Sequence, residues 1–251
     1  MHLKPIRSCV LGLLLLVGLS ACSGEGDTST PPPAPVPLAS AEGLWNGTTG
    51  TGRTISWLVL DDDVYWALYS EVSNPSILAG LVQGNSSSQN GVFTSSNARD
   101  FNLQTGLLNV TINGSYTAKQ SFNGQITYPG GPSTFTTTYD RDYDLAPDMN
   151  AVAGTYAGSV TASETVTVVL TTTGIISGSS NTGCLFAGTF SPRAHGNVFN
   201  VTITFGGQSG CSLGTETVNG IGFYDAVDKR LSSAALNTSR TDGFVFIGTK
   251  P

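Results

Sequence analysis

The sequence predicts an all-β protein in which two tandem β-rich domains follow a secretory signal and a disordered linker. Three observations favour this class. Beyond residue 41 the chain consists of short alternating or β-branched runs, Gly, Asn and Ser residues separate these runs, and short motifs recur in the two halves. Charged residues make up only 11% of the chain, a composition typical of secreted β-proteins and poor for long helices.

Residues 1–21 have the order of an export signal. Lys4 and Arg7 precede an apolar run from Cys9 to Leu19, and small residues follow. The run is shorter than the roughly 20 residues that cross a bilayer. We therefore expect a cleaved signal peptide rather than a permanent transmembrane helix.

The signal ends in Leu19-Ser20-Ala21-Cys22, which resembles the lipobox of bacterial lipoproteins. In that family the Cys thiol receives a diacylglyceryl group, a peptidase cuts before the Cys, and the new amine is usually acylated as well. The resemblance implies that Cys22 is the lipidated first residue, carrying acyl chains such as palmitate. Two or more chains anchor stably because each buried methylene contributes about 0.8 kcal/mol. Ser23, where an Asp would favour the inner membrane, points to the outer membrane.

Residues 22–41 form the predicted linker. They are rich in Gly, Ser, Thr and Pro and include the run from Pro31 to Pro33. Such a stretch cannot bury enough apolar surface to fold, and its prolines extend it as a semi-rigid spacer. Its expected function is to hold the following domains away from the lipid headgroups, on either the periplasmic or the surface face.

The expected mature chain is acidic. Loss of Lys4 and Arg7 with the signal lowers the basic residues from 11 to 9, against 17 acidic residues, which gives a formal charge of −8. An acidic chain repels phosphate backbones, so nucleic acid is not an expected partner.

Each of the four cysteines has an expected place. Cys9 is discarded with the signal and Cys22 is lipidated, which leaves Cys184 and Cys211. In an oxidising periplasm the default for such a pair is a disulfide. It closes a loop of about 27 residues. Because the bond restricts the unfolded chain, it should stabilise the folded state by roughly 3 kcal/mol. Zinc binding is the weaker hypothesis, because no His or second Cys pair lies at zinc-site spacing.

Short motifs recur in the same order in the two halves. The pairs are Gly43 to Gly47 with Gly154 to Gly158, Leu108 to Ile112 with Phe199 to Ile203, and Phe122 to Gly124 with Val218 to Gly220. We therefore expect a first domain over residues 42–146 and a second over residues 147–251. They join near Leu145 to Val152, where Pro147 interrupts the strand pattern.

Candidate strands in the first half follow from the alternating pattern. They are Thr54 to Leu60, Val64 to Ser70, Ile77 to Gln83, Leu107 to Ile112, Phe122 to Tyr128 and Ser133 to Tyr139. Asp61, Asp62 and Asp63 between the first two predict a hairpin turn, because Asp tolerates turn dihedrals and bonds to nearby backbone.

Each half offers about eight strands, enough for a small closed barrel that is filled by side chains or holds one ligand. A β-sandwich is the competing arrangement. The opening Gly-x-aromatic-x-Gly motif is similar to the first strand of lipocalin-type barrels. Surface lipoproteins of the transferrin-binding type share the tethered layout, but their longer motifs are absent from this sequence.

The second half resembles a family of proteobacterial outer-membrane lipoproteins. The motifs that carry the likeness are Gly183 to Phe190, Phe205 to Gly207 before Cys211, Ala234 to Asn237, and Gly243 to Thr249. Together with the Gly-x-Trp-x-Gly start, the likeness covers most of the mature chain. It implies an envelope location and a tethered layout, and it supplies no activity.

The sequence gives little support to catalysis. His195 is the one histidine outside the signal, and Pro192, Arg193 and Gly196 around it indicate a loop. A Ser-His-Asp hydrolase would need a loop serine such as Ser209 nearby, and the chain has no Gly-x-Ser-x-Gly elbow. We expect no catalytic residue.

Two acidic clusters are candidate sites. Asp140, Asp142 and Asp144 have the opening spacing of a calcium loop. Leu145 stands where the turn needs Gly and Ala151 where the bidentate Glu belongs, so a strand end is the preferred interpretation. Carboxylates for glycoside hydrolysis could come from Asp61 to Asp63 or Glu71, and a charged hairpin tip explains these residues more simply. No metal or cofactor is predicted.

Aromatic residues concentrate in the first half. They are Trp45, Trp57, Tyr65, Trp66 and Tyr69. Core packing accounts for most such residues, and a functional surface would first be sought among them.

These features favour a non-catalytic binding lipoprotein whose ligand is an unknown protein or small molecule. The alternatives are a structural envelope protein and, with less support, a periplasmic hydrolase. The ligand-binding residues remain unassigned by the sequence.

Overall fold

The computed structural model describes residues 39–159 and 164–251 of the chain. The predicted signal peptide, the predicted lipidation site Cys22 and nearly all of the predicted linker lie outside the described residues. The described part is all-β apart from two helices of four residues each, η1 (Arg141–Asp144) and α1 (Met149–Val152).

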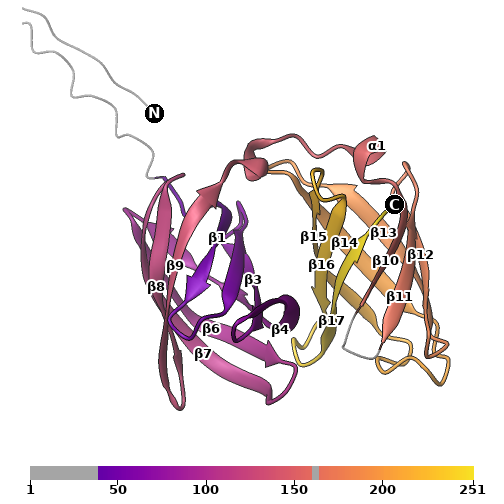
Figure 1. Cartoon of the computed structure of the whole chain (residues 1–251), viewed down its shortest axis with the longest axis horizontal. Coiled ribbons are helices and arrows are strands. Elements are labelled where there is room, and N and C mark those ends of the chain that lie inside the picture. Colours follow the sequence, from indigo (N-terminus) through magenta and orange to yellow (C-terminus); the bar gives the residue numbers. More distant parts are fainter. Residues whose placement is uncertain (1–38, 160–163) are drawn as a thin grey trace, which may run out of the picture. The chain divides into compact units, whose positions relative to one another are not determined.

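Eight of the first nine strands close into a barrel, and all nine form one sheet (Figure 1). They are β1 (Gly43–Thr49), β2 (Thr54–Val59), β3 (Val64–Glu71), β4 (Asn74–Asn85), β5 (Ser87–Gln89), β6 (Val92–Asn102), β7 (Gly106–Thr117), β8 (Ser121–Tyr128) and β9 (Gly131–Asp140). Strand β9 pairs with β1, and pairing of β4 with β6 closes the ring. The short β5 adds to the edge of β6.

The last eight strands form a second closed barrel (Figure 1). They are β10 (Gly154–Ser159), β11 (Thr165–Leu170), β12 (Ile175–Ser180), β13 (Leu185–Pro192), β14 (Val198–Phe205), β15 (Thr217–Asp225), β16 (Arg230–Leu236) and β17 (Gly243–Thr249). Every strand pairs antiparallel with the next, and β10 also pairs with β17. The barrel prediction is confirmed in both halves, and the β-sandwich alternative is wrong.

Alternation along each strand separates the barrel interior from the outer face. On β11, Val166 and Val168 are buried inside the second barrel, whereas Val169 between Val168 and Leu170 is 40% exposed. Successive side chains of a strand point to opposite faces, so a period of two places one set of apolar side chains inside the ring. The turn predicted at Asp61 to Asp63 joins β2 to β3.

Aromatic rings pack the centre of the first barrel. Trp57 lies at the centre, with ring centroids 4.9 Å from Phe135, 5.4 Å from Phe122 and 6.3 Å from Phe93. All four side chains are at most 2% exposed. Such tilted and edge-to-face pairs stabilise beyond the area they bury, so this core is densely packed.

Apolar side chains on the outer faces of both barrels share a further cluster. Its buried members are Leu44, Leu58, Leu60, Trp66, Leu81, Tyr143, Val198, Ile221, Ala234, Leu236 and Val245. At one edge of this cluster, Arg193 from the β13–β14 turn pairs with Asp61 at 2.6 Å and Asp62 at 3.2 Å in the β2–β3 turn. The two barrels therefore contact each other through apolar burial as well as charge.

Candidate functional site

The second barrel contains a cavity of about 390 Å³ with a mainly apolar wall. The apolar residues that line it from the interior of this barrel are Val166, Val168, Leu170, Ile176, Phe186, Phe190, Val201, Ile203, Phe205, Leu213, Leu231, Phe244 and Phe246, and Leu236 and Val245 line it from the outer face. The lining of the cavity includes Val and Ile side chains and no Trp, whereas Trp45 and Trp57 are buried in the core of the first barrel. Phe186, Phe205 and Phe244 remain partly exposed.

Helix α1 closes one end of this barrel. Val152 is fully buried in the barrel core and Met149 packs against it. Tyr156 and Tyr224 form an edge-to-face pair at 6.4 Å in the same core, and Lys250 Nζ lies 4.9 Å above the Tyr224 ring. These side chains seal the barrel beneath α1.

The opposite end carries the mouth of the cavity. The described lining residues there are the polar or small residues Glu164, Ser180, Gly210, Ser212, Thr241 and Asp242. They come from the ends of β11 and β12, the β14–β15 loop over residues 206–216, and the β16–β17 turn over residues 237–242. A ligand would therefore enter with its apolar part first and leave its polar end among these residues.

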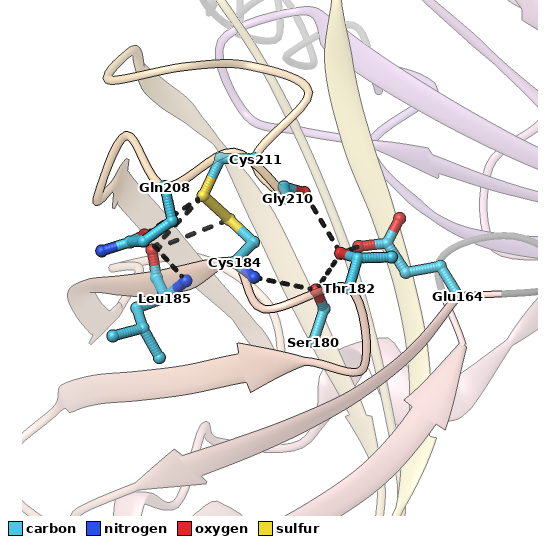
Figure 2. The surroundings of a disulfide bond; sticks show 8 residues. All are labelled: Glu164, Ser180, Thr182, Cys184, Leu185, Gln208, Gly210 and Cys211. Atoms are coloured by element: carbon cyan, nitrogen blue, oxygen red, sulfur yellow. Dashed lines mark hydrogen bonds between the residues drawn. A yellow bond between two sulfur atoms is a disulfide. The ribbon is translucent and has the colours of Figure 1, made fainter.

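A disulfide between Cys184 and Cys211 fixes one side of the mouth (Figure 2). Thr182 Oγ1 donates to the Gly210 carbonyl at 3.1 Å and lies 3.2 Å from Glu164 Oε1. Leu213, two residues beyond the disulfide, is only 8% exposed and lines the cavity. The predicted cysteine pair thus holds the β14–β15 loop against the barrel.

The first barrel holds the other side of the mouth. In the β16–β17 turn, Arg240 donates from Nε to Gln83 Oε1 at 2.6 Å and from Nη2 to the Gln83 carbonyl at 2.9 Å and the Asn97 carbonyl at 3.0 Å. Arg99 in turn donates to the carbonyls of Ser239, at 2.7 Å, and Arg240. The turn that carries Asp242 is therefore anchored to β4 and β6.

The β6–β7 hairpin extends the apolar wall beyond the second barrel. Leu103 and Leu107 line the cavity although they are 51% and 40% exposed. Leu81 and Phe101 from the same face of the first barrel also line it. Exposed leucines next to an apolar opening enlarge the surface that a ligand can cover.

A second, more polar cavity of about 530 Å³ lies in the first barrel. Asp100 lines it and is 2% exposed, and Tyr69 Oη donates to it at 2.6 Å. Burial raises the pKa of Asp100 above its ordinary value, while hydrogen bonds from Tyr69 and Tyr128 oppose this. Arg53 in this cavity donates to the Ser70 carbonyl at 2.8 Å. Because these polar groups already have partners within the chain, we place the candidate site in the second barrel.

His195 does not form a hydrolase site with Ser209. Its side chain is 59% exposed in the β13–β14 turn, with Nδ1 3.7 Å from Glu42 Oε1. Ser209 lies in the loop at the far end of β14, about 23 Å away at 3.3 Å per residue. The imidazole and that hydroxyl therefore stand at opposite ends of the barrel, which removes the support for a catalytic pair.

The acidic stretch near η1 has structural roles. Asp140 caps η1 by accepting from the Asp142 amide at 2.9 Å, and Asp144 pairs with Lys119 at 2.6 Å. Within residues 39–159 and 164–251, no group of three or more His, Cys, Asp and Glu side chains is arranged to hold a metal. The carboxylates considered for glycoside hydrolysis are also engaged, since Asp61 and Asp62 bind Arg193 and Glu71 accepts from Gln104 Nε2 at 3.2 Å.

The first-half aromatic residues do not form an exposed patch. Trp45, Trp57, Tyr65, Trp66 and Tyr69 are all at most 6% exposed, so core packing is confirmed for them. The lining of the candidate cavity instead comes mostly from the second half. The sequence signal that could have found it is the recurrence of inward Val, Ile and Phe on β11, β14 and β17 with no Trp among them.

The described fold defines an all-β protein of two tandem eight-stranded barrels, the first with a polar cavity and the second with a mainly apolar one. No protein-family model and no curated protein matches the chain. Among solved structures it is similar to isotype 1 transferrin binding protein B from serogroup B Neisseria meningitidis, at 8% identity and a TM-score of 0.27. The match covers 80% of this chain and 66% of that chain. At this TM-score the likeness has no bearing on function. Neither helix in the described residues has the length and hydrophobicity to span a bilayer.

Proposed function

We propose that this chain is a lipid-anchored, non-catalytic binding protein of the bacterial outer membrane whose second barrel holds a small apolar ligand. The observation that carries the proposal is the cavity of about 390 Å³ in that barrel. Small-molecule sites span roughly 300 to 1,000 Å³ and combine an apolar wall with a few polar groups. Eight-stranded barrels are wide enough to hold one small ligand.

The anchor rests on Cys22 and the export signal before it. Cys22→Ser removes the thiol that would receive the diacylglyceryl group. We expect the variant to accumulate as an unprocessed or misrouted precursor that leaves the outer-membrane fraction. Unchanged processing and unchanged membrane fractionation would contradict the anchor, without bearing on the cavity.

Ligand binding is tested on a soluble chain of residues 22–251 with Cys22→Ser. Both barrel cores lie within residues 38–251, which form one compact unit, so the missing lipid leaves them intact. The probe is N-phenyl-1-naphthylamine, an uncharged apolar dye that becomes fluorescent out of water. We expect saturable binding at one site per chain.

A matched pair of variants locates that site. Val168 lines the cavity, whereas the next residue on β11, Val169, is on the outer face and 40% exposed. Val168→Trp fills the cavity and should weaken dye binding at least about tenfold, and Val169→Trp should leave it unchanged. Circular dichroism melting of both variants checks that they fold. Equal binding by the two folded variants, or no binding by the parent chain, would overturn the proposal and favour a structural envelope role.

A further inference from the structure

We propose that the cavity in the first barrel is a second binding site, which takes a small organic carboxylate at the guanidinium of Arg53. This site is independent of the apolar cavity in the second barrel, because it rests on the separate cavity of about 530 Å³. That volume lies within the roughly 300 to 1,000 Å³ of small-molecule sites.

The cavity lies at one end of the first barrel. Arg53 reaches it from the β1–β2 turn, and Ser133 reaches it from the start of β9. The residues just before β1 close the opposite end, since Ala41 is fully buried in the barrel core and the Ala39 carbonyl accepts from Tyr116 Oη at 2.8 Å. A ligand would therefore enter beside the β1–β2 and β8–β9 turns.

Arg53 brings a positive charge to this cavity without an ionic partner. Its guanidinium donates from Nη1 to the Ser70 carbonyl at 2.8 Å and lies over the Tyr69 ring, 5.5 Å from the centroid. No carboxylate of residues 39–159 or 164–251 forms an ion pair with it. Because a guanidinium has five N–H donors, one bond to a carbonyl leaves donors for a bound anion.

The fold holds Arg53 in place before any ligand arrives. The Arg53 carbonyl accepts from the Thr49 amide at 2.9 Å, and the Arg53 amide donates to Thr49 Oγ1 at 3.2 Å. The Gly50 amide donates to the Thr134 carbonyl at 2.8 Å, which fixes the β1–β2 turn against β9. A group that is already ordered loses less conformational freedom on binding, so this arrangement favours affinity.

The other lining residues favour an organic carboxylate over an inorganic anion. The planar guanidinium matches a carboxylate in a bidentate pair. Arg53 is the one cationic side chain that lines the cavity among the described residues, so it balances one negative charge. Ile55, Leu108 and Ile126 line the same cavity and would cover an apolar body attached to the carboxylate.

Asp100 also lines this cavity, but its oxygens have other partners. Tyr69 Oη donates to Asp100 at 2.6 Å, and Tyr128 supplies a second hydroxyl. Burial raises the pKa of Asp100, whereas these two hydrogen bonds and the charge of Arg53 lower it. Asp100 is only 2% exposed, so a ligand would meet the half-buried Arg53 rather than this carboxyl.

The test compares three ligands that share one phenyl ring: benzoate, benzamide and benzylamine. Each is titrated at pH 7 by isothermal calorimetry into the soluble chain of residues 22–251 with Cys22→Ser. Benzamide has nearly the shape of benzoate without its charge, and benzylamine carries the opposite charge. We expect benzoate to bind saturably at one site per chain and benzamide to bind at least about tenfold more weakly. Benzylamine should show no binding.

Two variants locate the benzoate site. Arg53→Gln removes the guanidinium and should weaken benzoate binding at least about tenfold. The matched control is Arg141→Gln, which removes the same charge from an exposed residue that does not line the cavity and should leave binding unchanged. Circular dichroism melting checks that both variants fold. If Arg53→Gln does not fold, the comparison of benzoate with benzamide on the parent chain decides.

The outcomes keep this site apart from the proposed function. Val168→Trp should leave benzoate binding unchanged, and Arg53→Gln should leave dye binding in the second barrel unchanged. The carboxylate site is wrong if the parent chain does not bind benzoate, if benzamide binds as tightly, or if folded Arg53→Gln binds benzoate like the parent. Loss of benzoate binding in Val168→Trp alone would place the ligand in the second barrel and also overturn it.

Discussion

Arg240 and Gln83 join the two barrels at the mouth of the cavity. The guanidinium donates to the Gln83 side chain at 2.6 Å and to its carbonyl at 2.9 Å. The pair lies 157 residues apart in the chain, and Gln83 is 6% exposed. The turn that carries Asp242 thus depends on a polar residue buried in β4.

Replacement of Arg240 tests this docking. Arg240→Ala leaves Gln83 without its charged donor, and hydrogen bonds to charged groups contribute about 1.5 to 3 kcal/mol. We expect the free energy of unfolding in urea to fall by about 2 kcal/mol. The control is Arg230→Ala, because Arg230 is 47% exposed and its ion pairs are 3.6 and 3.9 Å long. That change should cost less than about 0.5 kcal/mol, and equal losses in the two variants would contradict a special role for Arg240.

The Cys184–Cys211 disulfide should stabilise the second barrel and its mouth. Replacing both cysteines by Ala removes the restriction on the unfolded chain, and we expect a loss of about 3 kcal/mol in urea unfolding. Amide hydrogen exchange should accelerate most in residues 206–216, which carry Leu213. A free-thiol assay on the denatured, unreduced mature protein should detect no thiol. A titratable thiol pair in that assay would show that the bond does not form.

Asp100 should make the stability of the first barrel depend on pH. Because burial raises its pKa in the folded state above the ordinary value of 3.8, the native chain binds more protons than the unfolded chain as pH rises above that value. The contribution of protonated Asp100 to the free energy of unfolding is therefore lost as pH rises and Asp100 ionises. Asp100→Asn removes this loss and keeps an oxygen that can accept from Tyr69.

The measurement is the free energy of unfolding of Asp100→Asn and of the parent chain from about pH 4 to pH 7. We expect the stability of the variant relative to the parent to increase across this range. A difference that stays constant, or decreases, would mean that the folded chain does not favour protonated Asp100.

Gly158 should be required for closure of the second barrel. A Cβ at this position would lie 2.2 Å from the Ile247 carbonyl oxygen on β17, the strand that closes the ring. Gly158→Ala should destabilise by about 1 to 3 kcal/mol or more, because packed backbone yields little. Gly130→Ala is the control, since a Cβ there meets nothing within 4 Å. Thermal melting of the two variants gives the comparison, and a stable Gly158→Ala chain would contradict the close approach.

The repeat predicted from the sequence has a structural counterpart at the start of each barrel. Trp45 donates from Nε1 to the Ala41 carbonyl at 2.9 Å, and Tyr156 donates from Oη to the Val152 carbonyl. Both acceptors lie four residues before the aromatic residue. Gly47 allows the backbone of β9 to approach β1 closely, and Gly158 does the same for β17 and β10. The Gly-x-aromatic-x-Gly motif predicts the first strand of each barrel because it supplies both the aromatic donor and the Gly that these contacts require.

Strand β6 was not among the predicted strands of the first half. Its sequence, Val92–Asn102, places the polar residues Ser95 and Asp100 inside the barrel, and its register shifts between Ser95 and Ala98. Both features break the alternation of apolar and polar residues on which strand prediction depends. Polar side chains inside a barrel are acceptable only when distant partners such as Tyr65 and Tyr69 reach them, and the local sequence does not reveal such partners.

The sequence by itself determined the all-β class, the order of most strands, the two-part repeat and the cysteine pair, because these follow from local alternation, turn residues and composition. The lipidation of Cys22 stays a prediction. Only the tertiary structure decided that each half closes into a barrel, that aromatic rings pack around Trp57 in the first, and that the second keeps an apolar cavity. The physical reason is that the cavity depends on side chains from many strands, and on contacts such as Arg240 with Gln83 between residues far apart in the chain.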